Sequence, residues 1–424
     1  MYRSDNEPFA VILFAPRFCY SPRVYLVFYF LVIVQIALGL YSLWRGIVWL
    51  RMVQRAAGTH HGFYAPIVAL ICPCKGTEHG LEQNLAALTR FDYPRYEIFF
   101  AIASADDPAM RVIERVKAGS ERPVHVVIAG APDKSGEKVH NLLRAYETVP
   151  DSTEVLVFTD SDVRLPRGWL TKLVTPLQDP GLGAVTTYRW LIPSGGIGSG
   201  ALASSLASAW NGAIVTLLGN PRDNFCWGGG TAIRRATFID AQVPYAWAGA
   251  LSDDFALTSA LEANRKSIIF CPQCLAATPH PWTLSSLLEF TNRQILITKI
   301  YSPKRWKMGA MAHLSYAATL IYAAIVIAVT AAGGDPWTQL ALVAFVILLL
   351  AALKGALRTI AAIELLPEWK KQLNNWSWVW MSFAPIVPFL YAWNFIASLL
   401  TNRIRWRNIR YELLSPSVTR IIKR

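Results

Sequence analysis

Apolar and polar residues are unevenly distributed along this chain of 424 residues. Three apolar runs without Asp, Glu, Lys or Arg are long enough to approach or exceed the span of a bilayer, and a fourth is interrupted by two prolines. These runs are Val24–Trp44, Gly309–Ala332, Trp337–Leu353 and Trp376–Leu400. The stretch between the first two has ordinary mixed polarity and is long enough for one sizeable core. The pattern predicts a membrane protein with one large domain outside the bilayer.

Within that domain, short apolar runs alternate with segments that have helical spacing. Strands are predicted at 65–73, 96–104, 124–130 and 155–159, and helices at 81–91, 107–119 and 137–147. Strict strand and helix alternation is typical of a mostly parallel sheet covered by helices on both faces. In open sheets of this kind, ligands bind beyond the carboxyl ends of the strands. Asp106 and Asp107 follow the second strand, and Asp160 and Asp162 follow the fourth, so a site is predicted at that edge.

The charge of the chain suits a membrane surface better than nucleic acid. The formal net charge is +13, but the central domain has no basic stripe interleaved with stacking aromatics. Basic residues instead gather beside the apolar runs, at Arg45, Arg51 and Arg55 and again at Arg403, Arg405, Arg407 and Arg410. By the positive-inside rule this distribution predicts an integral membrane protein whose central domain faces the cytoplasm. The first run is too long for a signal peptide and is interpreted as a retained anchor.

The cysteines offer a weaker signal. Two of the six cysteines form Cys72-Pro-Cys74, and two form Cys271-Pro-Gln-Cys274. The second pair has a metal-like spacing, but no histidine stands at a metal-type spacing from either pair. Buried, reduced cysteines of a cytoplasmic domain are the interpretation that we adopt.

Asp160-Ser161-Asp162 is the only Asp-x-Asp in the sequence, and it follows the buried strand 155–159. Two carboxylates so placed can contribute oxygen ligands to Mg²⁺ or Mn²⁺, which fill their remaining positions with water and phosphate. The structural alternative is a solvated turn in which aspartate caps the next helix. The position directly after a buried strand makes the metal interpretation equally tenable.

A second acidic pair, Asp253-Asp254, stands at the start of a predicted helix. Compensation of the helix dipole explains such a pair without any function, whereas a carboxylate in a cleft can also take a proton. Before it, the run Gly228–Gly230 either forms a tight turn or lets the backbone approach a ligand closely. Residue chemistry alone leaves both pairs of alternatives open.

A series of motifs resembles the ceramide glucosyltransferase family, of the family-2 type with a GT-A fold. The series covers roughly residues 65–306 in the family's order, with one anchor before it and further membrane segments after it. Its motifs are "ICPCKGTEHGLEQNLAALTRFDYPRYEIFFAIASADDPAM", "GEKVHNL", "TDSDVRLPRGWL", "LGAVTTYRW", "GGGTAIRR" and "SDDFAL".

The resemblance implies a role for each position that it aligns. Asp106, Asp107 and Lys138 would contact the nucleotide sugar, as would Asp160. Asp160 and Asp162 would hold a Mg²⁺ or Mn²⁺ ion on the diphosphate, and Asp254 would be the catalytic base. In the last motif of the family, Arg293 and Gln294 are the aligned candidates to bind the nucleotide sugar.

That last motif departs from the family. The family usually has Gln or Arg, two residues, and then Arg-Trp. Here the stretch is "RQILITKIY": Arg293 fits the start, but Leu296 and Ile297 stand where Arg-Trp is expected, and starting from Gln294 gives no better match. Lys299 and the pair Arg305–Trp306 are the candidates to substitute.

The predicted function is a membrane-bound inverting glycosyltransferase with a GT-A-type α/β domain. It would move a hexose, most simply glucose from UDP-glucose, to the hydroxyl of a membrane lipid such as ceramide. A hopanoid- or polyprenyl-lipid glycosyltransferase differs only in its acceptor, and a processive polysaccharide synthase shares the acids but needs a channel. A transporter is disfavoured because the apolar runs carry no charged residue.

The predicted organisation has five parts. They are an anchor at 1–61, a cytoplasmic GT-A domain at 62–290, an interfacial segment at 291–308, membrane segments at 309–400 and a basic cytoplasmic tail at 401–424. Pro385 and Pro388 each remove a helical hydrogen bond, and a re-entrant hairpin broken there would keep the basic tail inside. Three full spans and one re-entrant or interfacial element are therefore predicted, with a kinked fourth span as the alternative.

Overall fold

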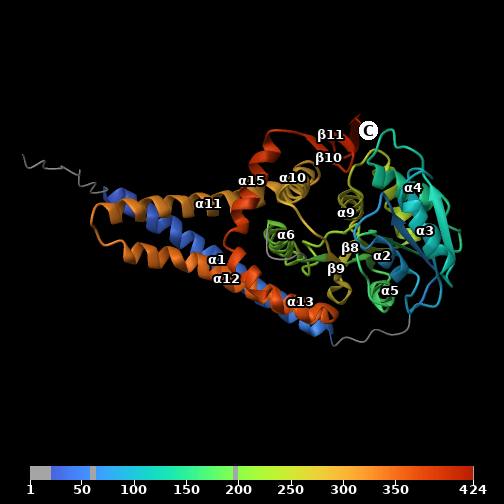
Figure 1. The fold of residues 1–424 in the computed structure, drawn as a ribbon, viewed down its shortest axis with the longest axis horizontal. Coiled ribbons are helices and arrows are strands. Elements are labelled where there is room, and N and C mark those ends of the chain that lie inside the picture. The colour runs from blue at the N-terminus through green and yellow to red at the C-terminus, as the bar shows by residue number, and fades with distance from the viewer. Residues whose placement is uncertain (1–20, 58–63, 194–198, 424) are drawn as a thin grey trace, which may run out of the picture.

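A seven-stranded sheet forms the centre of the large domain in this computed structural model, which describes residues 21–57, 64–193 and 199–423 (Figure 1). The strand order is β3-β2-β1-β4-β7-β5-β8, and only β7 runs antiparallel to its neighbours. The strands are β1 (Val68–Pro73), β2 (Tyr96–Ile102), β3 (Val124–Ile128), β4 (Val155–Thr159), β5 (Leu182–Thr186), β7 (Gly230–Arg234) and β8 (Ser267–Phe270). A two-stranded parallel sheet, β6 (Arg189–Ile192) with β9 (Ala276–Pro279), lies apart from it.

Alternate residues of the central strands enter two different hydrophobic clusters. In β4, Val155 and Val157 pack on one face of the sheet, and Leu156 and Phe158 on the other. This is the period-two pattern of a sheet buried on both sides. One face is covered by α2 (Leu81–Leu88), α3 (Ala109–Ala118) and α5 (Trp169–Val174), and the other by α4 (Glu137–Glu147), α7 (Arg235–Asp240), α8 (Val243–Trp247) and α9 (Asp253–Ala263).

The predicted fold class is confirmed. Each of the four predicted strands and three predicted helices is present within a few residues of its expected limits. The strands β1, β2, β3 and β4 are mutually parallel, as their alternation with helices predicted. Their carboxyl ends therefore meet at one edge of the sheet, where the predicted site residues lie.

Three helices are long and apolar enough to cross a membrane: α1 (Pro22–Ala57), α11 (Pro303–Ala332) and α12 (Thr338–Leu365). They extend together away from the sheet domain, with the α11–α12 connection at the far end (Figure 1). A fourth apolar unit is bent by 60° between α14 (Ser377–Phe383) and α15 (Val387–Leu399), so the described residues offer three spans, or up to four if this pair counts as one. The bend falls at Pro385 and Pro388, as the sequence predicted.

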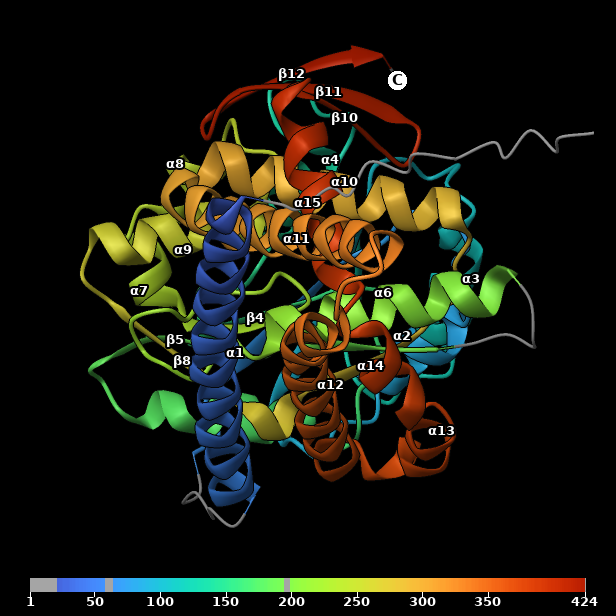
Figure 2. The ribbon, with the colours of Figure 1, turned by 90° about the vertical axis from the view of Figure 1, so that its left-hand side faces the viewer.

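The helices between the sheet and the membrane bundle are α6 (Ser199–Val215) and α10 (Leu284–Tyr301), with the short α13 (Lys370–Asn375) beside the end of α12. Short 3₁₀ turns lie at Thr175–Gln178, Pro272–Cys274 and Pro367–Trp369. Helix α10 begins with a capping box in which Thr283 and Ser286 bond to each other's backbone N–H. It packs against α11 and α15, beside which Figure 2 shows it. It thus lies between the domain and the bundle (Figure 1).

The segment after α15 forms a three-stranded antiparallel sheet of β10 (Arg403–Trp406), β11 (Ile409–Ser415) and β12 (Val418–Lys423). Its arginines alternate with apolar residues, and Ile404, Ile409, Tyr411 and Leu413 are buried in the same cluster as α4 and α9. We call β10 and β11, with their connecting turn, the C-terminal hairpin. The basic residues that the sequence assigned to a tail therefore belong to a sheet docked on the large domain.

The cysteines of the described residues are free and buried: Cys72, Cys74, Cys226, Cys271 and Cys274. The Cys271 and Cys274 sulfurs are 3.3 Å apart, and no group of three or more metal-ligating side chains is found in the described ranges.

The docking of the C-terminal hairpin bears on membrane topology. Because the hairpin contacts the large domain, both must lie on the same side of the bilayer. If α11 and α12 each cross once, the bent α14–α15 unit cannot add a net crossing. With the domain on the cytoplasmic side, as the positive-inside rule predicts, a cysteine at Ser417 in a cysteine-free background should resist an impermeant thiol reagent in intact cells.

The matched control is a cysteine at Asp335, in the turn between α11 and α12, which should be labelled from outside. Labelling at both positions would favour a full fourth span and contradict the docked hairpin, whereas labelling at position 417 alone would place the domain itself outside.

Candidate active site

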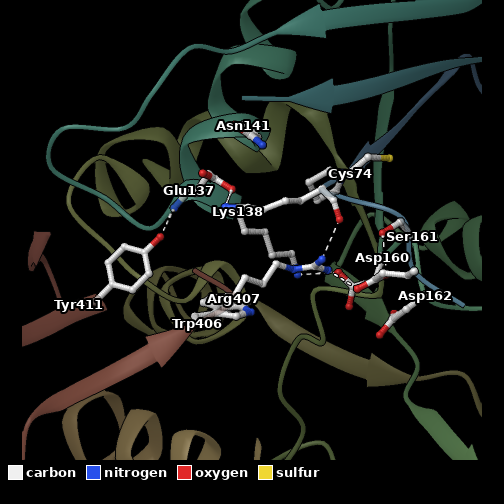
Figure 3. Close-up of a pocket in the computed structure, with 13 residues that line it drawn as sticks. Cys74, Glu137, Lys138, Asn141, Asp160, Ser161, Asp162, Trp406, Arg407 and Tyr411 are labelled. Atoms are coloured by element: carbon white, nitrogen blue, oxygen red, sulfur yellow. Dashed lines mark hydrogen bonds and ion pairs between the residues drawn. The ribbon is translucent and has the colours of Figure 1, made fainter. Parts of the chain in front are cut away.

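The turn after β4 carries Asp160 and Asp162 to the carboxyl edge of the sheet, as predicted. Asn84 on α2 donates from Nδ2 to the Ser161 carbonyl at 3.1 Å, and Ser161 Oγ donates to Glu78 at 3.3 Å. These two hydrogen bonds hold the Ser161 turn in place, and the carboxylates on either side of it line a pocket. Figure 3 shows both at its wall.

Lys138 links three elements through its ammonium group. Its Nζ lies 2.7 Å from Oδ1 of Asp160 and 3.2 Å from Oδ2 of Asp253. Lys138 comes from α4, Asp160 from the turn after β4, and Asp253 from the first turn of α9. The side chains are 16, 21 and 5% exposed, so the three charges form a largely dry cluster. We call it the Lys138 cluster.

Burial and charge oppose one another within the Lys138 cluster. Burial lowers the pKa of Lys138, but the negative charges of Asp160 and then Asp253 raise it by more. The net pKa is above its ordinary value, so the ammonium stays charged. Burial raises the pKa of Asp160, yet Lys138 and more distant arginines together hold it below its ordinary value. Burial raises the pKa of Asp253 to about 6 despite Lys138. The positive charge of Lys138 thus keeps Asp160 ionised although Asp160 is largely buried.

The run Gly228–Gly230 closes against this cluster. A Cβ on Gly228 would lie 2.1 Å from Oδ2 of Asp253, and one on Gly229 would lie 2.7 Å from Oδ2 of Asp160. Both distances are too short for any side chain. Gly228 and Gly229 form a tight turn, in which the N–H of Gly230 donates to the carbonyl of Trp227 at 3.0 Å. The tight turn is therefore present, and it lies directly beside the charged groups. Approach of this backbone to a ligand stays a prediction.

Asp162 has a different partner, Arg189, which the sequence analysis did not single out. Arg189 Nη1 lies 3.3 Å from Oδ2 of Asp162, and its guanidinium stacks over Phe290 and Trp227. The other carboxylate oxygen, Oδ1 of Asp162, is buried without a hydrogen-bond partner in the described structure. The signal that could have revealed Arg189 is a charged residue within the otherwise apolar strand "RWLI".

The acidic pair on α9 divides into two environments. Asp253 belongs to the Lys138 cluster. Asp254, half-buried, has its Oδ1 fixed by the backbone N–H of Phe255 at 2.8 Å and by the hydroxyl of Ser252. Asp253 thus ties the start of α9 to the Lys138 cluster, and Asp254 is oriented by its own helix start. Acceptance of a proton by Asp254 stays a prediction.

Asp106 and Asp107 lie after β2, at the same edge of the sheet. Asp106 is exposed, whereas Oδ1 of Asp107 accepts from the backbone N–H of Gly76 at 2.7 Å and of Ala109 at 2.8 Å. Gly76, with φ of 63°, is next to the pocket residue Lys75. Asp107 therefore fixes the loop that forms one pocket wall.

The C-terminal hairpin supplies the remaining wall, which the sequence did not predict. Trp406 and Arg407 line the pocket together with Tyr411. Arg407 Nη1 donates to the carbonyl of Lys75 at 2.7 Å, and its other terminal nitrogen pairs with Glu78. Figure 3 shows Lys138 and Arg407 extending into the pocket from α4 and from the hairpin. The pocket is lined by Pro73, Cys74, Lys75, Glu78, Glu137, Lys138, Asn141, Asp160, Ser161, Asp162, Trp406, Arg407 and Tyr411.

The residues of the atypical "RQILITKIY" stretch lie on α10. The Arg293 guanidinium stacks 5.2 Å from the centre of the Trp406 ring, and burial, followed by Arg189, lowers its pKa to about 10. Gln294 is half-buried beside it, and Leu296 and Ile297 are buried in the core.

The two proposed substitutes for the missing arginine have other partners. Lys299 donates to the backbone carbonyls of Ser398 and Thr401, and Arg305 pairs with Glu262 at 3.2 Å. Neither lines the pocket.

The structure thus brings Lys138, Asp160 and Asp162 together in the pocket. Asp254, Asp106, Asp107, Arg293 and Gln294 are not among its lining residues. Their roles in binding or catalysis stay predictions. Arg189, Glu78 and Arg407 join the candidate site from segments to which the sequence analysis had assigned no role in it.

Comparisons with known proteins identify relatives of the chain. The family model "Glycosyl transferase family 21" matches residues 27–417. Ceramide glucosyltransferase 1 of Caenorhabditis elegans is 27% identical over 123 residues, 28% of this chain and 26% of that protein. The ceramide glucosyltransferase of Gibberella zeae is 28% identical over 142 residues, 31% of this chain and 26% of that protein. The chain thus aligns with about a quarter of the length of these curated relatives.

Among solved structures, the mannosyltransferase PcManGT from Pyrobaculum calidifontis, in complex with GDP-Man and Mn²⁺, has a TM-score of 0.49 at 17% identity. The similarity covers 86% of this chain and 99% of that one. Glucosyl-3-phosphoglycerate synthase from Mycobacterium tuberculosis, in complex with Mn²⁺, UDP and glucosyl-3-phosphoglycerate, has a TM-score of 0.35 at 17% identity and covers 58% of this chain and 81% of its own.

The Lys138 cluster should be essential for stability. In Lys138→Met, two buried carboxylates lose their shared counter-ion, and breaking a buried pair in this way costs about 3–5 kcal/mol. We expect a clear fall in the thermal unfolding midpoint of the detergent-solubilised protein at neutral pH. Lys134→Met, at an exposed lysine on the preceding loop, is the matched control and should leave the midpoint unchanged. Equal midpoints for both variants would mean that the cluster is not stabilising.

Proposed function

The chain belongs to glycosyl transferase family 21, and on that premise we propose that this glycosyltransferase moves a hexose from a nucleotide-sugar donor to the hydroxyl of a membrane lipid. The observation that carries the proposal is the pocket at the carboxyl edge of the sheet that is lined by Asp160, Asp162 and Lys138. The similarity to ceramide glucosyltransferases supports glucose as the sugar, UDP-glucose as the donor and a ceramide-like acceptor.

The two carboxylates fit a divalent cation. Asp160 and Asp162 each give one oxygen to a cationic side chain, and Oδ1 of Asp162 is left buried and without a partner. A buried, unpaired carboxylate oxygen is costly unless something positive meets it. Mg²⁺ and Mn²⁺ are bound through one or two carboxylates together with substrate phosphates, so a larger ligand set is not needed. A cation held here by Asp160 and Asp162 would offset the negative charge of the donor diphosphate.

Asp254 is the residue we assign as catalytic base. Both of its fixed contacts go to Oδ1, which leaves Oδ2 to accept a proton. In the proposed step the acceptor oxygen forms a bond to C1 of the sugar, and the bond from C1 to the diphosphate oxygen breaks. The electron pair leaves with the diphosphate, and the hydroxyl proton passes to Asp254. A single displacement of this kind inverts the configuration at C1.

Asp253 has a supporting role in this proposal. Its carboxylate is engaged by Lys138 and is only 5% exposed. It therefore positions Lys138, which in turn holds Asp160 ionised. The roles of the neighbouring acids differ because one faces the Lys138 cluster and the other does not.

The proposal is tested by incubating detergent extracts with labelled UDP-glucose and a mixture of ceramide, hopanoid and polyprenyl lipids. Label in a lipid product would support the proposal, and its chromatographic identity would name the acceptor. Label in a polymer would point to a processive synthase, and label in neither fraction would count against the proposal.

Removing the base should separate binding from turnover. Asp254→Asn keeps the shape of the side chain but cannot take the proton, so we expect UDP binding to persist and turnover to fall by roughly a hundredfold or more. Asp240→Asn, at the exposed end of α7, is the control and should be as active as wild type. If Asp254→Asn turned over normally but failed to bind UDP, Asp254 would be a donor-binding residue.

Metal dependence is checked at Asp162. Asp162→Ala removes the unpaired oxygen, and we expect it to abolish the stimulation of turnover by added Mg²⁺ or Mn²⁺. Excess EDTA should inactivate the wild type, and restored metal should reactivate it. Full activity of the wild type in EDTA would exclude a metal-dependent mechanism.

A further inference from the structure

Even with a divalent cation held by Asp160 and Asp162, the side chains that line the pocket do not balance the negative charge of the donor diphosphate that the proposed function requires. Among its lining residues, Lys75, Lys138 and Arg407 are cationic, whereas Glu78, Glu137, Asp160 and Asp162 are anionic. Lys75 is paired with Glu137 at 2.6 Å, and Lys138 is held by two carboxylates. To bind a diphosphate here, a cationic side chain must be able to exchange its present partner for the phosphates. It must do so without leaving a buried carboxylate unpaired.

Arg407 meets that requirement. Its guanidinium lies in the pocket, its backbone is in the turn of the C-terminal hairpin, and its side chain is 36% exposed. Its anionic partner, Glu78, has a second contact from Ser161. A planar guanidinium can bind two phosphate oxygens at once, so exchange of Glu78 for a diphosphate is chemically favourable.

The backbone of Arg407 has a conformation that disfavours a side chain at this position. Trp406 pairs with Ile409 across the hairpin, which leaves a two-residue turn at Arg407 and Asn408. Arg407 has φ of 53°, in the left-handed region that such turns normally assign to glycine. A larger side chain costs about 1–2 kcal/mol there, so the presence of arginine is not explained by the turn.

Helix α10 meets the same hairpin tip. Arg293 stacks on the Trp406 ring, while Leu296 and Ile297, where an Arg-Trp pair was expected, are turned into the core. A tryptophan and an arginine, the residue types that α10 lacks, thus lie beside α10 as Trp406 and Arg407 of the C-terminal hairpin.

We infer that Arg407, positioned by Trp406 at the tip of the C-terminal hairpin, is the residue that binds the donor diphosphate and neutralises the charge it gains on leaving. Glu78 holds the guanidinium in place before the donor enters. The inference rests on the proposed function, since it assigns a new residue to that same site.

The test measures UDP binding to the full-length protein in detergent with Mg²⁺, for wild type, Arg407→Gly and Arg407→Lys. Glycine suits the positive φ and removes only the side chain, so the turn itself is kept. Loss of a charge-assisted contact predicts UDP affinity about ten- to a hundredfold weaker in Arg407→Gly, with partial recovery in Arg407→Lys. Arg410→Gln removes an exposed arginine from the same hairpin and should bind UDP as wild type does.

The outcomes distinguish the two proposals. Wild-type UDP affinity in Arg407→Gly would overturn this inference and leave the proposed function standing. Equal weakening in Arg407→Gly and Arg410→Gln would also overturn it, because the effect would then be general loss of positive charge. Absence of UDP binding by the wild type would overturn the proposed donor itself. The thermal midpoint of Arg407→Gly, measured without nucleotide, should stay near that of wild type; a large fall would assign Arg407 a structural role instead.

Discussion

The ion cluster around Lys138 is the interaction on which the arrangement of the site depends. One ammonium group joins α4, the turn after β4 and the start of α9. Because the carboxylates are largely buried, neither could remain charged there without this partner. The cluster also dictates the nearby backbone, since Gly228 and Gly229 have no room for a Cβ beside its oxygens. The carboxylates of Asp160 and Asp253, the close-packed glycine turn and the start of α9 are therefore a single structural unit.

Much of the fold could be predicted because it is encoded locally. The strands that end at Pro73 and Thr159 are short apolar runs, and the helices between them have regular apolar spacing, so the parallel sheet follows from periodicity. The position of Asp160 at the carboxyl edge follows in turn from the sheet. The same logic anticipated the break at Pro385, because a missing N–H acts on the helix in which it lies.

The parts of the site that escaped prediction depend on contacts between distant segments. Arg189 is one charged residue in a short strand, and nothing near it in sequence indicates that it pairs with Asp162. The segment after α15 was interpreted by its net charge, although its alternation of arginines with Ile404, Ile409 and Tyr411 is the pattern of a half-buried hairpin. The net charge predicts a basic tail that includes Arg407, whereas the alternation of apolar and charged residues predicts strands. No local feature of Arg407 reveals Glu78 as its partner.

The C-terminal hairpin also sets the order in which the protein can become competent during its synthesis. Arg407 and the Lys75 carbonyl that it bonds are 332 positions apart in the chain. Everything between them, including α11, α12 and the bent α14–α15 unit, leaves the ribosome before the last wall of the pocket exists. Until then the nascent chain exposes Glu78 and Asp162 without Arg407 beside them. The pocket can therefore be completed only after the apolar helices have been synthesised, and a chain stalled before residue 403 would lack the pocket wall that Trp406 and Arg407 form.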